Sequence, residues 1–150
     1  MSPLTPPTDE TVSRINDWAT QTEIGKWLAF SCALTDDKLR YRLSVAPHHV
    51  GNSAIGALHG GVISTFLQSA ARWEVQARLA DPANVHVVTV HCDYLRSAPM
   101  KDLYTEVEII RVGRRIGFVT ASAWQDDRAK PQARVSVNLR IGASENSTPS

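Results

Sequence analysis

A histidine followed by two glycines stands at the start of a long apolar segment, and this arrangement could do chemistry. The residues are His59, Gly60 and Gly61, and the apolar segment after them is typical of a helix. Because glycine has no side chain, another group can closely approach the free N–H donors of the first helical turn. Those donors, with the positive end of the helix dipole, suit a carbonyl oxygen that becomes negative during acyl transfer.

A second group of candidate residues consists of arginines around a predicted turn. Arg111, Arg114 and Arg115 surround Gly113, between two segments with the composition of strands. The planar fork of the arginine side chain matches the geometry of phosphate groups. The cluster is therefore consistent with a phosphate-binding turn and equally with a solvated turn, and both alternatives stay open.

Other reactive residue types have simpler explanations. His59 could act as an acid, but capping of the helix through a backbone hydrogen bond is favoured. His48 and His49 are adjacent in a predicted loop, with no acidic or cysteine partner at metal-binding spacing, so no metal site is expected. His91 and Cys92 alternate in a predicted strand, where packing or interface roles are favoured over a nucleophile pair.

The composition of the chain excludes several classes of protein. Its 150 residues fit one domain, and 16 Lys and Arg against 15 Asp and Glu leave a formal charge of +1. This balance gives no electrostatic footprint for nucleic acid. The N-terminus lacks a secretion signal, and no apolar run is long enough to span a membrane. We therefore expect a cytoplasmic protein with neither nucleic-acid nor membrane partners.

The apolar pattern predicts the elements that must position these groups. Residues 9–21 have an apolar face at helical spacing, and residues 27–34 and 38–45 have the composition of two strands. Residues 46–58 form a predicted loop. The predicted helix from residue 59 to about residue 79 is apolar around most of its circumference, which is typical of a helix wrapped by a sheet.

A narrower polar stripe on this helix contains Gly61, Ser64, Gln68 and Arg72. The remaining segments are predicted antiparallel strands, at residues 85–96, 103–112, 116–125 and 133–141. This order predicts an α+β fold in which an antiparallel sheet wraps around one long central helix. We expect a single domain over residues 10–142, with disordered tails at residues 1–9 and 143–150.

Three sequence pieces carry a resemblance to a known family. They are Ile55-Gly-Ala-Leu-His-Gly-Gly61, Asp93-Tyr-Leu-Arg96 and Arg111-Val-Gly-Arg-Arg115. In this order, with the first piece opening a long apolar helix, they resemble the hot-dog fold of the thioesterase superfamily. More closely, residues 10–142 resemble the branch typified by phenylacetyl-CoA and medium-chain acyl-CoA thioesterases.

The resemblance implies roles for the helix residues. In that family the backbone N–H of the first glycine, here Gly60, polarises the thioester carbonyl. An Asp or Glu nine residues beyond the histidine, contributed by the neighbouring subunit, acts as base or nucleophile, and this chain has Gln68 there. A carboxylate can take a proton from water, whereas an amide cannot do so near neutral pH. Gln68 can still position a water, with help from Ser64 or Ser53.

The resemblance also implies substrate contacts outside the helix. An asparagine six residues before the histidine orients the thioester or water in some members; here that position is Ser53, with Asn52 adjacent. A Ser or Thr on the strand after the helix often assists, and the best-aligned position is Val87, with Thr89 close by. Gly61 and the turn residues Arg111, Gly113, Arg114 and Arg115 are then expected to contact the coenzyme A part of the substrate.

Two functions remain open at this point. The first is an acyl-CoA or aryl-CoA thioesterase that works with Gln68 in place of the carboxylate. The second is a non-catalytic acyl-CoA-binding protein, or a partner subunit of an active paralogue. A dehydratase on the same fold would pair a histidine with an acid on the helix, and no such pair is visible. No cofactor is expected beyond the coenzyme A of the substrate.

The resemblance further implies a homodimer or homotetramer. In this fold two subunits join their sheets edge to edge through the strand at residues 85–96, which removes an exposed strand edge. The substrate tunnel then lies between subunits, so that a monomer lacks a complete site.

Overall fold

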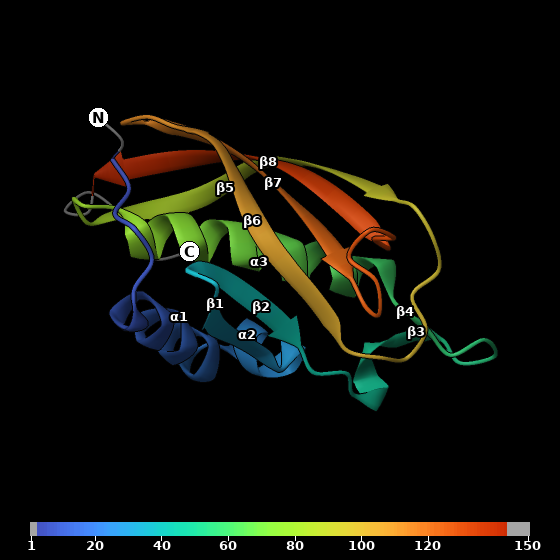
Figure 1. Cartoon of the computed structure of the whole chain (residues 1–150). Helices are drawn as coiled ribbons and strands as arrows, with labels where there is room; N and C mark the ends of the chain where they lie inside the picture. The colour runs from blue at the N-terminus through green and yellow to red at the C-terminus, as the bar shows by residue number, and fades with distance from the viewer. Residues whose placement is uncertain (1–2, 144–150) are drawn as a thin grey trace.

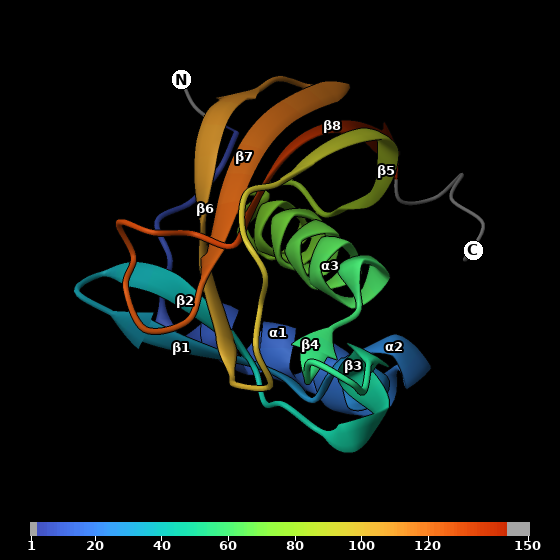
Figure 2. The ribbon, with the colours of Figure 1, turned by 90° about the vertical axis from the view of Figure 1, so that its right-hand side faces the viewer.

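A computed structural model of the chain describes residues 3–143 and shows a sheet curled around a long helix (Figures 1 and 2). The helices are α1 (Asp9–Gln21), α2 (Glu23–Leu28) and α3 (Gly60–Arg78), with a 3-10 turn at Pro47–His49. The strands are β1 (Phe30–Thr35), β2 (Lys38–Leu43), β3 (Val50–Asn52), β4 (Ala57–Leu58), β5 (Ala83–Tyr94), β6 (Leu103–Val112), β7 (Ile116–Trp124) and β8 (Ala133–Ala143).

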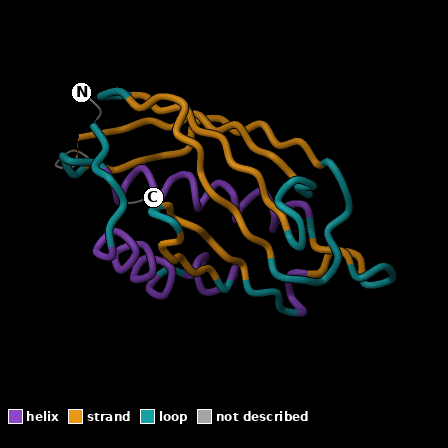
Figure 3. The backbone as a smooth tube through the Cα atoms, viewed as in Figure 1, coloured by secondary structure: helices purple, strands orange, loops and turns teal. Residues whose placement is uncertain are grey.

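Six of the strands form one antiparallel sheet in the order β1-β2-β6-β7-β8-β5. The sheet wraps around α3, while α1 and α2 close the side of α3 that faces away from β7 and β8 (Figures 1 and 3). The strands β3 and β4 pair separately as a small hairpin before α3. The predicted α+β hot-dog architecture is therefore confirmed.

The core forms around α3 because this helix is apolar on most of its surface. Phe66, Leu67 and Ala70 are fully buried, and so is Val75 one turn later. Phe30 of β1 packs edge-on against Phe66, with ring centroids 5.7 Å apart. Burying such side chains supplies most of the driving force for folding. The same packing fixes the orientation of α3 under the sheet.

The strand β5 forms one edge of the sheet and carries a β-bulge between Val87 and Thr89. Val87 lies opposite the buried Leu139 of β8, whereas Thr89 lies opposite the exposed Asn138. One inserted residue reverses which side chains face the helix. After the bulge, the inner face of β5 therefore carries Val90, Cys92 and Tyr94.

The segment predicted as a strand from residue 27 begins as a helix instead. Residues Glu23–Leu28 form α2, and β1 starts at Phe30. The Thr22 side chain caps α2 by accepting from the Gly25 N–H, at 3.2 Å. A Cβ at Gly25 would lie 2.2 Å from the Ala19 carbonyl oxygen, so glycine allows α2 to pack directly on α1. This close approach overrides the strand composition of the segment.

Other boundaries also differ from the predictions. The predicted strand at residues 38–45 ends at Leu43, and the predicted loop at residues 46–58 contains the 3-10 turn and the β3–β4 hairpin. Residues 3–8, expected in a disordered tail, contact the end of α3: the Thr5 N–H donates to the Arg78 carbonyl at 2.7 Å. Residues 1–2 and 144–150 of the predicted tails lie outside the described residues. None of the described helices is both long and apolar enough to cross a membrane.

Candidate active site

The His-Gly-Gly sequence forms a self-capped start to α3. His59 is the N-cap residue, and its Nδ1 accepts a hydrogen bond from the Gly61 N–H at 2.9 Å. Its carbonyl accepts from the N–H groups of Val62 at 3.0 Å and Ile63 at 3.3 Å. A Cβ at Gly61 would lie 3.1 Å from His59 Nδ1, so the missing side chain makes room for the imidazole. His59 thus satisfies donors of the first turn that would otherwise be unpaired.

One donor of this turn remains, the N–H of Gly60. No group in residues 3–143 accepts a hydrogen bond from it. The Tyr94 hydroxyl, at the end of β5, donates to the Gly60 carbonyl at 2.7 Å, and a Cβ at Gly60 would lie 3.3 Å from the tyrosine ring. The helix terminus is therefore held against β5 while its remaining N–H stays available.

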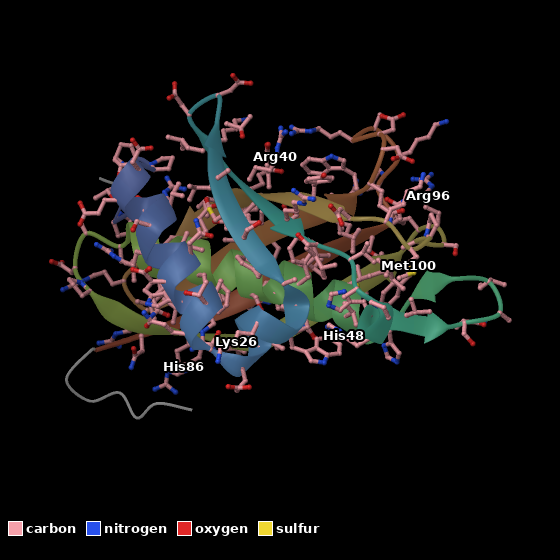
Figure 4. The ribbon with its side chains drawn as sticks, turned by 90° about the horizontal axis from the view of Figure 1, so that it is seen from below. Lys26, Arg40, His48, His86, Arg96 and Met100 are labelled. Atoms are coloured by element: carbon pink, nitrogen blue, oxygen red, sulfur yellow. The ribbon has the colours of Figure 1, made fainter. Side chains whose placement is uncertain are left out.

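Gly60 lines a pocket of about 380 Å³ between α3 and the connection from β5 to β6. The other residues that line it are Ala57, Leu58, Ile63, Tyr94, Leu95, Arg96, Ser97 and Ala98. This connection joins the β3–β4 hairpin, because the Leu58 N–H donates to the Ala98 carbonyl at 2.8 Å. In Figure 4, Arg96 and Met100 mark the connection beside the hairpin. A thioester carbonyl in this pocket would have the Gly60 N–H as a hydrogen-bond donor.

Gln68 and Ser64 follow on the flank of α3 beside β5. The Gln68 Nε2 donates to Ser64 Oγ at 2.9 Å, and no donor in the described residues reaches Gln68 Oε1. Burial holds the pKa of the Cys92 thiol above its ordinary value, although hydrogen bonds with the side chains of Tyr94 and Ser64 lower it. Gly60, Ser64, Gln68, Cys92 and Tyr94 therefore occupy one continuous region, between the first half of α3 and the end of β5.

Tyr94 and Cys92 are additions to the residues predicted from sequence. A strict alternation counted from Val85 places Thr89, His91 and Asp93 on the inner face of β5. The bulge reverses this assignment and turns Cys92 and Tyr94 toward α3. The signal available in the sequence was the Asp93-Tyr-Leu-Arg96 motif, which marks the segment without fixing its register.

Val87 and Thr89 are separated by the same bulge. Val87 lies on the inner face, half-buried against α3. Thr89 lies on the outer face, where its Oγ1 accepts from Asn138 Nδ2 at 2.7 Å. Within one chain, Thr89 therefore does not join the Gly60 region.

Asn52 and Ser53 lie at the connection between β3 and β4, which projects away from the body of the molecule (Figure 1). Both side chains are exposed, and Asn52 Oδ1 accepts from the Ala54 N–H at 3.1 Å. No hydrogen bond joins either residue to Gly60 or Gln68. Within one chain these two predicted residues stand apart from the helix terminus.

The arginine turn lies at the other end of the molecule from Gly60. The Gly113 N–H donates to the Ile116 carbonyl at 2.9 Å and closes the turn. Ile116 pairs with Arg140, which pairs with His86 near the start of β5, and Figure 4 shows His86 far from Met100. A pocket of about 860 Å³ here includes Gly113, Arg114, Arg115 and Arg140. An adjoining pocket of about 420 Å³ includes Arg111.

The other titratable groups that the sequence analysis considered have structural partners. His48 Nε2 and His49 Nε2 both contact the Trp27 carbonyl, at 2.6 and 2.7 Å, and burial lowers the pKa of His49. Glu74 lies on another face of α3, where it accepts from the Tyr41 hydroxyl at 2.8 Å. In the described part of the chain, no group of three or more His, Cys, Asp or Glu residues could hold a metal ion.

The fold and this helix terminus define a hot-dog protein of the thioesterase superfamily. Within it, the chain belongs to the family of the acyl-CoA thioesterase N-terminal domain, whose model matches residues 48–140. A predicted esterase of Halobacterium salinarum is 30% identical over 87 residues, covering 57% of this chain and 55% of that protein. The chain thus matches about half the length of this relative.

Solved structures show the same fold. A thioesterase from Haemophilus influenzae has a TM-score of 0.79 at 16% identity, with 92% of this chain and 94% of that chain covered. A glutamine-to-alanine variant of a thioesterase from Pseudomonas aeruginosa has a TM-score of 0.78 at 18% identity, with 94% and 99% covered. At these identities the similarity establishes the architecture.

Proposed function

We propose that this chain hydrolyses the thioester bond of an acyl- or aryl-CoA, as do phenylacetyl-CoA and medium-chain acyl-CoA thioesterases. The observation that carries the proposal is the unpaired N–H of Gly60 at the start of α3, on the wall of a pocket. When water attacks a thioester, the carbonyl oxygen becomes negative. A preorganised N–H at the positive end of a helix dipole stabilises that oxygen.

Gln68 of the neighbouring subunit has the role of orienting the water that attacks at Gly60, because the eight residues of α3 between them span about 12 Å within one chain. Its Nε2 is held by Ser64 Oγ, which leaves Oε1 to accept a hydrogen bond from water. The water oxygen bonds to the thioester carbon, the carbon–sulfur bond breaks, and the coenzyme A sulfur leaves and takes up a proton. Because an amide cannot accept the proton of the water, we expect a rate about two to four orders of magnitude below that of a carboxylate enzyme.

A homodimer through β5 explains the position of the arginine turn. Within one chain, Gly60 and the turn at Gly113 are separated by the length of α3, whose 19 residues span about 28 Å. Antiparallel pairing of two β5 edges reverses the second copy and brings its turn to the Gly60 end. The turn of the second copy then lies three strands from the shared edge, about 14 Å away at ~4.8 Å per strand. Arg111, Arg114 and Arg115 would hold coenzyme A phosphates across the interface.

The charge around the turn supports this phosphate site. Arg111, Arg114, Arg115 and Arg140 are exposed, and none of them makes an ion pair within residues 3–143. The residues that line the two pockets at this turn include these four arginines and one acidic residue, Asp81, so positive charge predominates there. Unneutralised guanidinium groups of this kind attract phosphates and match them by paired hydrogen bonds.

The test is hydrolysis of a panel of acyl-CoA and aryl-CoA thioesters by the purified chain, with a thiol reagent detecting free coenzyme A. The variants Gln68→Glu and Gln68→Ala are assayed alongside. We expect turnover by the unmodified chain and slower turnover by Gln68→Ala, because alanine cannot orient water.

A binding function without catalysis is the second candidate, and the neutral side chain of Gln68 is the observation that favours it. If the unmodified chain were inactive and Gln68→Glu active, the chain would be an acyl-CoA-binding protein or the partner of an active paralogue. Inactivity of both proteins on every thioester would contradict the catalytic proposal.

A further inference from the structure

His49, in the 3-10 turn before β3, is a fully buried polar residue with no part in the mechanism above. Its Nδ1 accepts a hydrogen bond from the Ala46 N–H at 3.0 Å, and its own N–H donates to the Ala46 carbonyl at 2.9 Å. Its Nε2 lies 2.7 Å from the Trp27 carbonyl, in the last turn of α2. Because a backbone N–H only donates and a carbonyl only accepts, the ring is the neutral tautomer with its proton on Nε2. The imidazole therefore ties the turn to α2 through both ring nitrogens.

The backbone of His49 holds the residue that caps α3. The His49 carbonyl accepts a hydrogen bond from the His59 N–H at 2.9 Å. The carbonyl of His59 is bound as well, because it accepts from N–H groups of the first helical turn. The peptide bond between His59 and Gly60 is planar, so the backbone of His59 sets the direction of the Gly60 N–H. The place of the His49 carbonyl thereby helps to aim the proposed oxyanion donor.

A second contact brings the same segment against His59. A Cβ at Gly51 would lie 2.9 Å from the His59 Cα and 3.0 Å from its Cβ, so β3 touches His59 with no side chain between them. The strand β3 pairs with β4, which leads into α3. Figure 4 shows His48 in the turn, between α2 and this hairpin. The turn and β3 therefore support the N-cap of α3, and the imidazole of His49 anchors this support on α2.

Resting on the proposed function, we propose that His49 is a positioning residue for thioester hydrolysis, which acts through His59 on the direction of the Gly60 N–H. The imidazole is fully buried and is not among the residues that line the Gly60 pocket, so it acts without contacting the substrate. An oxyanion donor works because it is preorganised at the place where charge develops. Misplacing a reacting group by about 1 Å can lower a rate about 100-fold.

Four substitutions separate positioning from a purely structural role. His49→Phe keeps a ring of similar shape and removes both ring hydrogen bonds. His49→Gln keeps an N–H donor that can reach the Trp27 carbonyl. His48→Gln is the matched control, because His48 Nε2 contacts the same carbonyl at 2.6 Å but its side chain is exposed. Gly51→Ala pushes on the backbone of His59 and leaves both histidines of the turn unchanged.

The first readout is kcat and KM on an acyl-CoA that the unmodified chain hydrolyses, below the temperature at which each variant unfolds. We expect His49→Phe to lower kcat about 10- to 100-fold and to leave KM nearly unchanged, because the Gly60 N–H acts on charge that develops in the transition state. Gly51→Ala should show the same pattern. His49→Gln should recover most of the rate, and His48→Gln should match the unmodified chain.

The second readout is amide hydrogen exchange by NMR, which needs no substrate. The His59 N–H should exchange about 10-fold faster in His49→Phe, as expected when a buried hydrogen bond is weakened. The reference is the N–H of Cys32 on β1, which donates to Asn16 Oδ1 at the same distance of 2.9 Å. Its exchange should be unchanged, which would show that the effect of the substitution is local.

Two results would each overturn the proposal: an unchanged kcat in folded His49→Phe, or an unchanged exchange rate of the His59 N–H in that variant. A higher KM at the same kcat would overturn it too, because it would give His49 a part in substrate binding. If His49→Phe does not fold, Gly51→Ala and His49→Gln decide in the same two measurements. If the unmodified chain hydrolyses no thioester, the proposed function fails separately. Hydrogen exchange then still decides whether His49 fixes His59.

Discussion

The imidazole of His59 accepts a hydrogen bond from the backbone of Gly61, two residues later, at 2.9 Å. This contact requires an unprotonated Nδ1, and it uses the ring nitrogen closest to the start of α3. The histidine of the His-Gly-Gly sequence therefore has a structural task, which is to fix the helix terminus that presents the Gly60 N–H. The capping role can be separated experimentally from a role in proton transfer.

We predict that His59→Asn retains stability and activity, because asparagine is among the best N-cap residues. His59→Ala removes the cap and should lower the free energy of unfolding by about 1 kcal/mol, measured by urea denaturation. If His59 were instead a general acid, both variants would lose about two to four orders of magnitude in rate. A rate for His59→Asn close to that of the unmodified chain is the outcome that the capping role requires.

Glu74 gives the stability of the chain a predictable pH dependence. Burial raises the pKa of Glu74 above its ordinary value of 4.5, although the Tyr41 hydroxyl and Arg78 lower it. The folded chain thus binds this proton more tightly than the unfolded chain does. The contribution of Glu74 to stability is fully present below the ordinary pKa and is lost as the pH rises through the raised value. The variant Glu74→Gln has no ionisable side chain at this position, so it serves as the reference for the pH dependence.

The stability of the unmodified chain relative to Glu74→Gln should therefore fall as the pH rises above 4.5, in urea unfolding at a series of pH values.

Asp102 provides the matched comparison, because its pKa is shifted in the opposite direction. Burial by itself raises the pKa of Asp102, but the Val45 N–H and Arg42 outweigh it and hold the pKa below the ordinary value. Relative to Asp102→Asn, the unmodified chain should lose stability as the pH falls through that lowered pKa. For Glu74, the opposite result would be a stability, relative to Glu74→Gln, that increases as the pH rises. That result would mean that the ion pair of Glu74 with Arg78 outweighs the effect of burial.

The edge strand β5 provides a test of the dimer. Val90 lies on the inner face of β5 and is 39% exposed in one chain. An inward-pointing charge on an edge strand opposes pairing with another edge. Val90→Lys should give a monomer in sedimentation velocity and should lose hydrolysis, although Gly60 and Gln68 are intact. Glu108→Lys, which places a lysine on an exposed position of β6, should change neither.

The contact between α1 and α2 predicts a large effect of one methyl group. A Cβ at Gly25 would lie 2.2 Å from the carbonyl oxygen of Ala19, which is backbone and cannot move independently. Gly25→Ala should lower the free energy of unfolding by about 1–3 kcal/mol, the usual cost of overpacking. Gly117→Ala is the control, because its Cβ would have ordinary contacts of 3.5 Å and more. Equal thermal stability of both variants would contradict the packing described.

The long helix and four of the strands could be predicted because their patterns are strong and local. The apolar surface of α3 has helical spacing, and β6 has the predicted bounds of Leu103–Val112. The helix α2 could not be predicted, since it depends on the approach of Gly25 to Ala19, a contact between two elements. Propensity gives way to tertiary packing in such segments.

The site was predictable to the same extent. Gly60 follows from the His-Gly-Gly sequence at the start of a helix, whereas Gln68 was chosen through the resemblance, which implies an Asp or Glu nine residues beyond the histidine. Tyr94 was missed because a bulge near Thr89 reverses the faces of β5, and alternation does not reveal a single inserted residue. The arginine turn was found, but its distance from Gly60 within one chain depends on the strand order of the sheet, which residue spacing does not reveal.

The central claim is that the Gly60 N–H stabilises the thioester oxyanion, and two substitutions at this residue isolate it. Gly60→Pro removes the N–H at the first helical position, where proline is well tolerated. The preceding residue, His59, has φ −67° and ψ 133°, which suits a residue before proline. Gly60→Ala is the matched control, because it adds a Cβ near the exposed Tyr94 ring and keeps the N–H.

The most direct measurement is the rate of thioester hydrolysis by these two variants and the unmodified chain, under saturating acyl-CoA. We predict that Gly60→Ala stays within a few-fold of the unmodified chain, whereas Gly60→Pro loses about 10²–10³-fold, as expected for the loss of one oxyanion donor. Equal rates for Gly60→Pro and Gly60→Ala, with both proteins folded, would contradict the account.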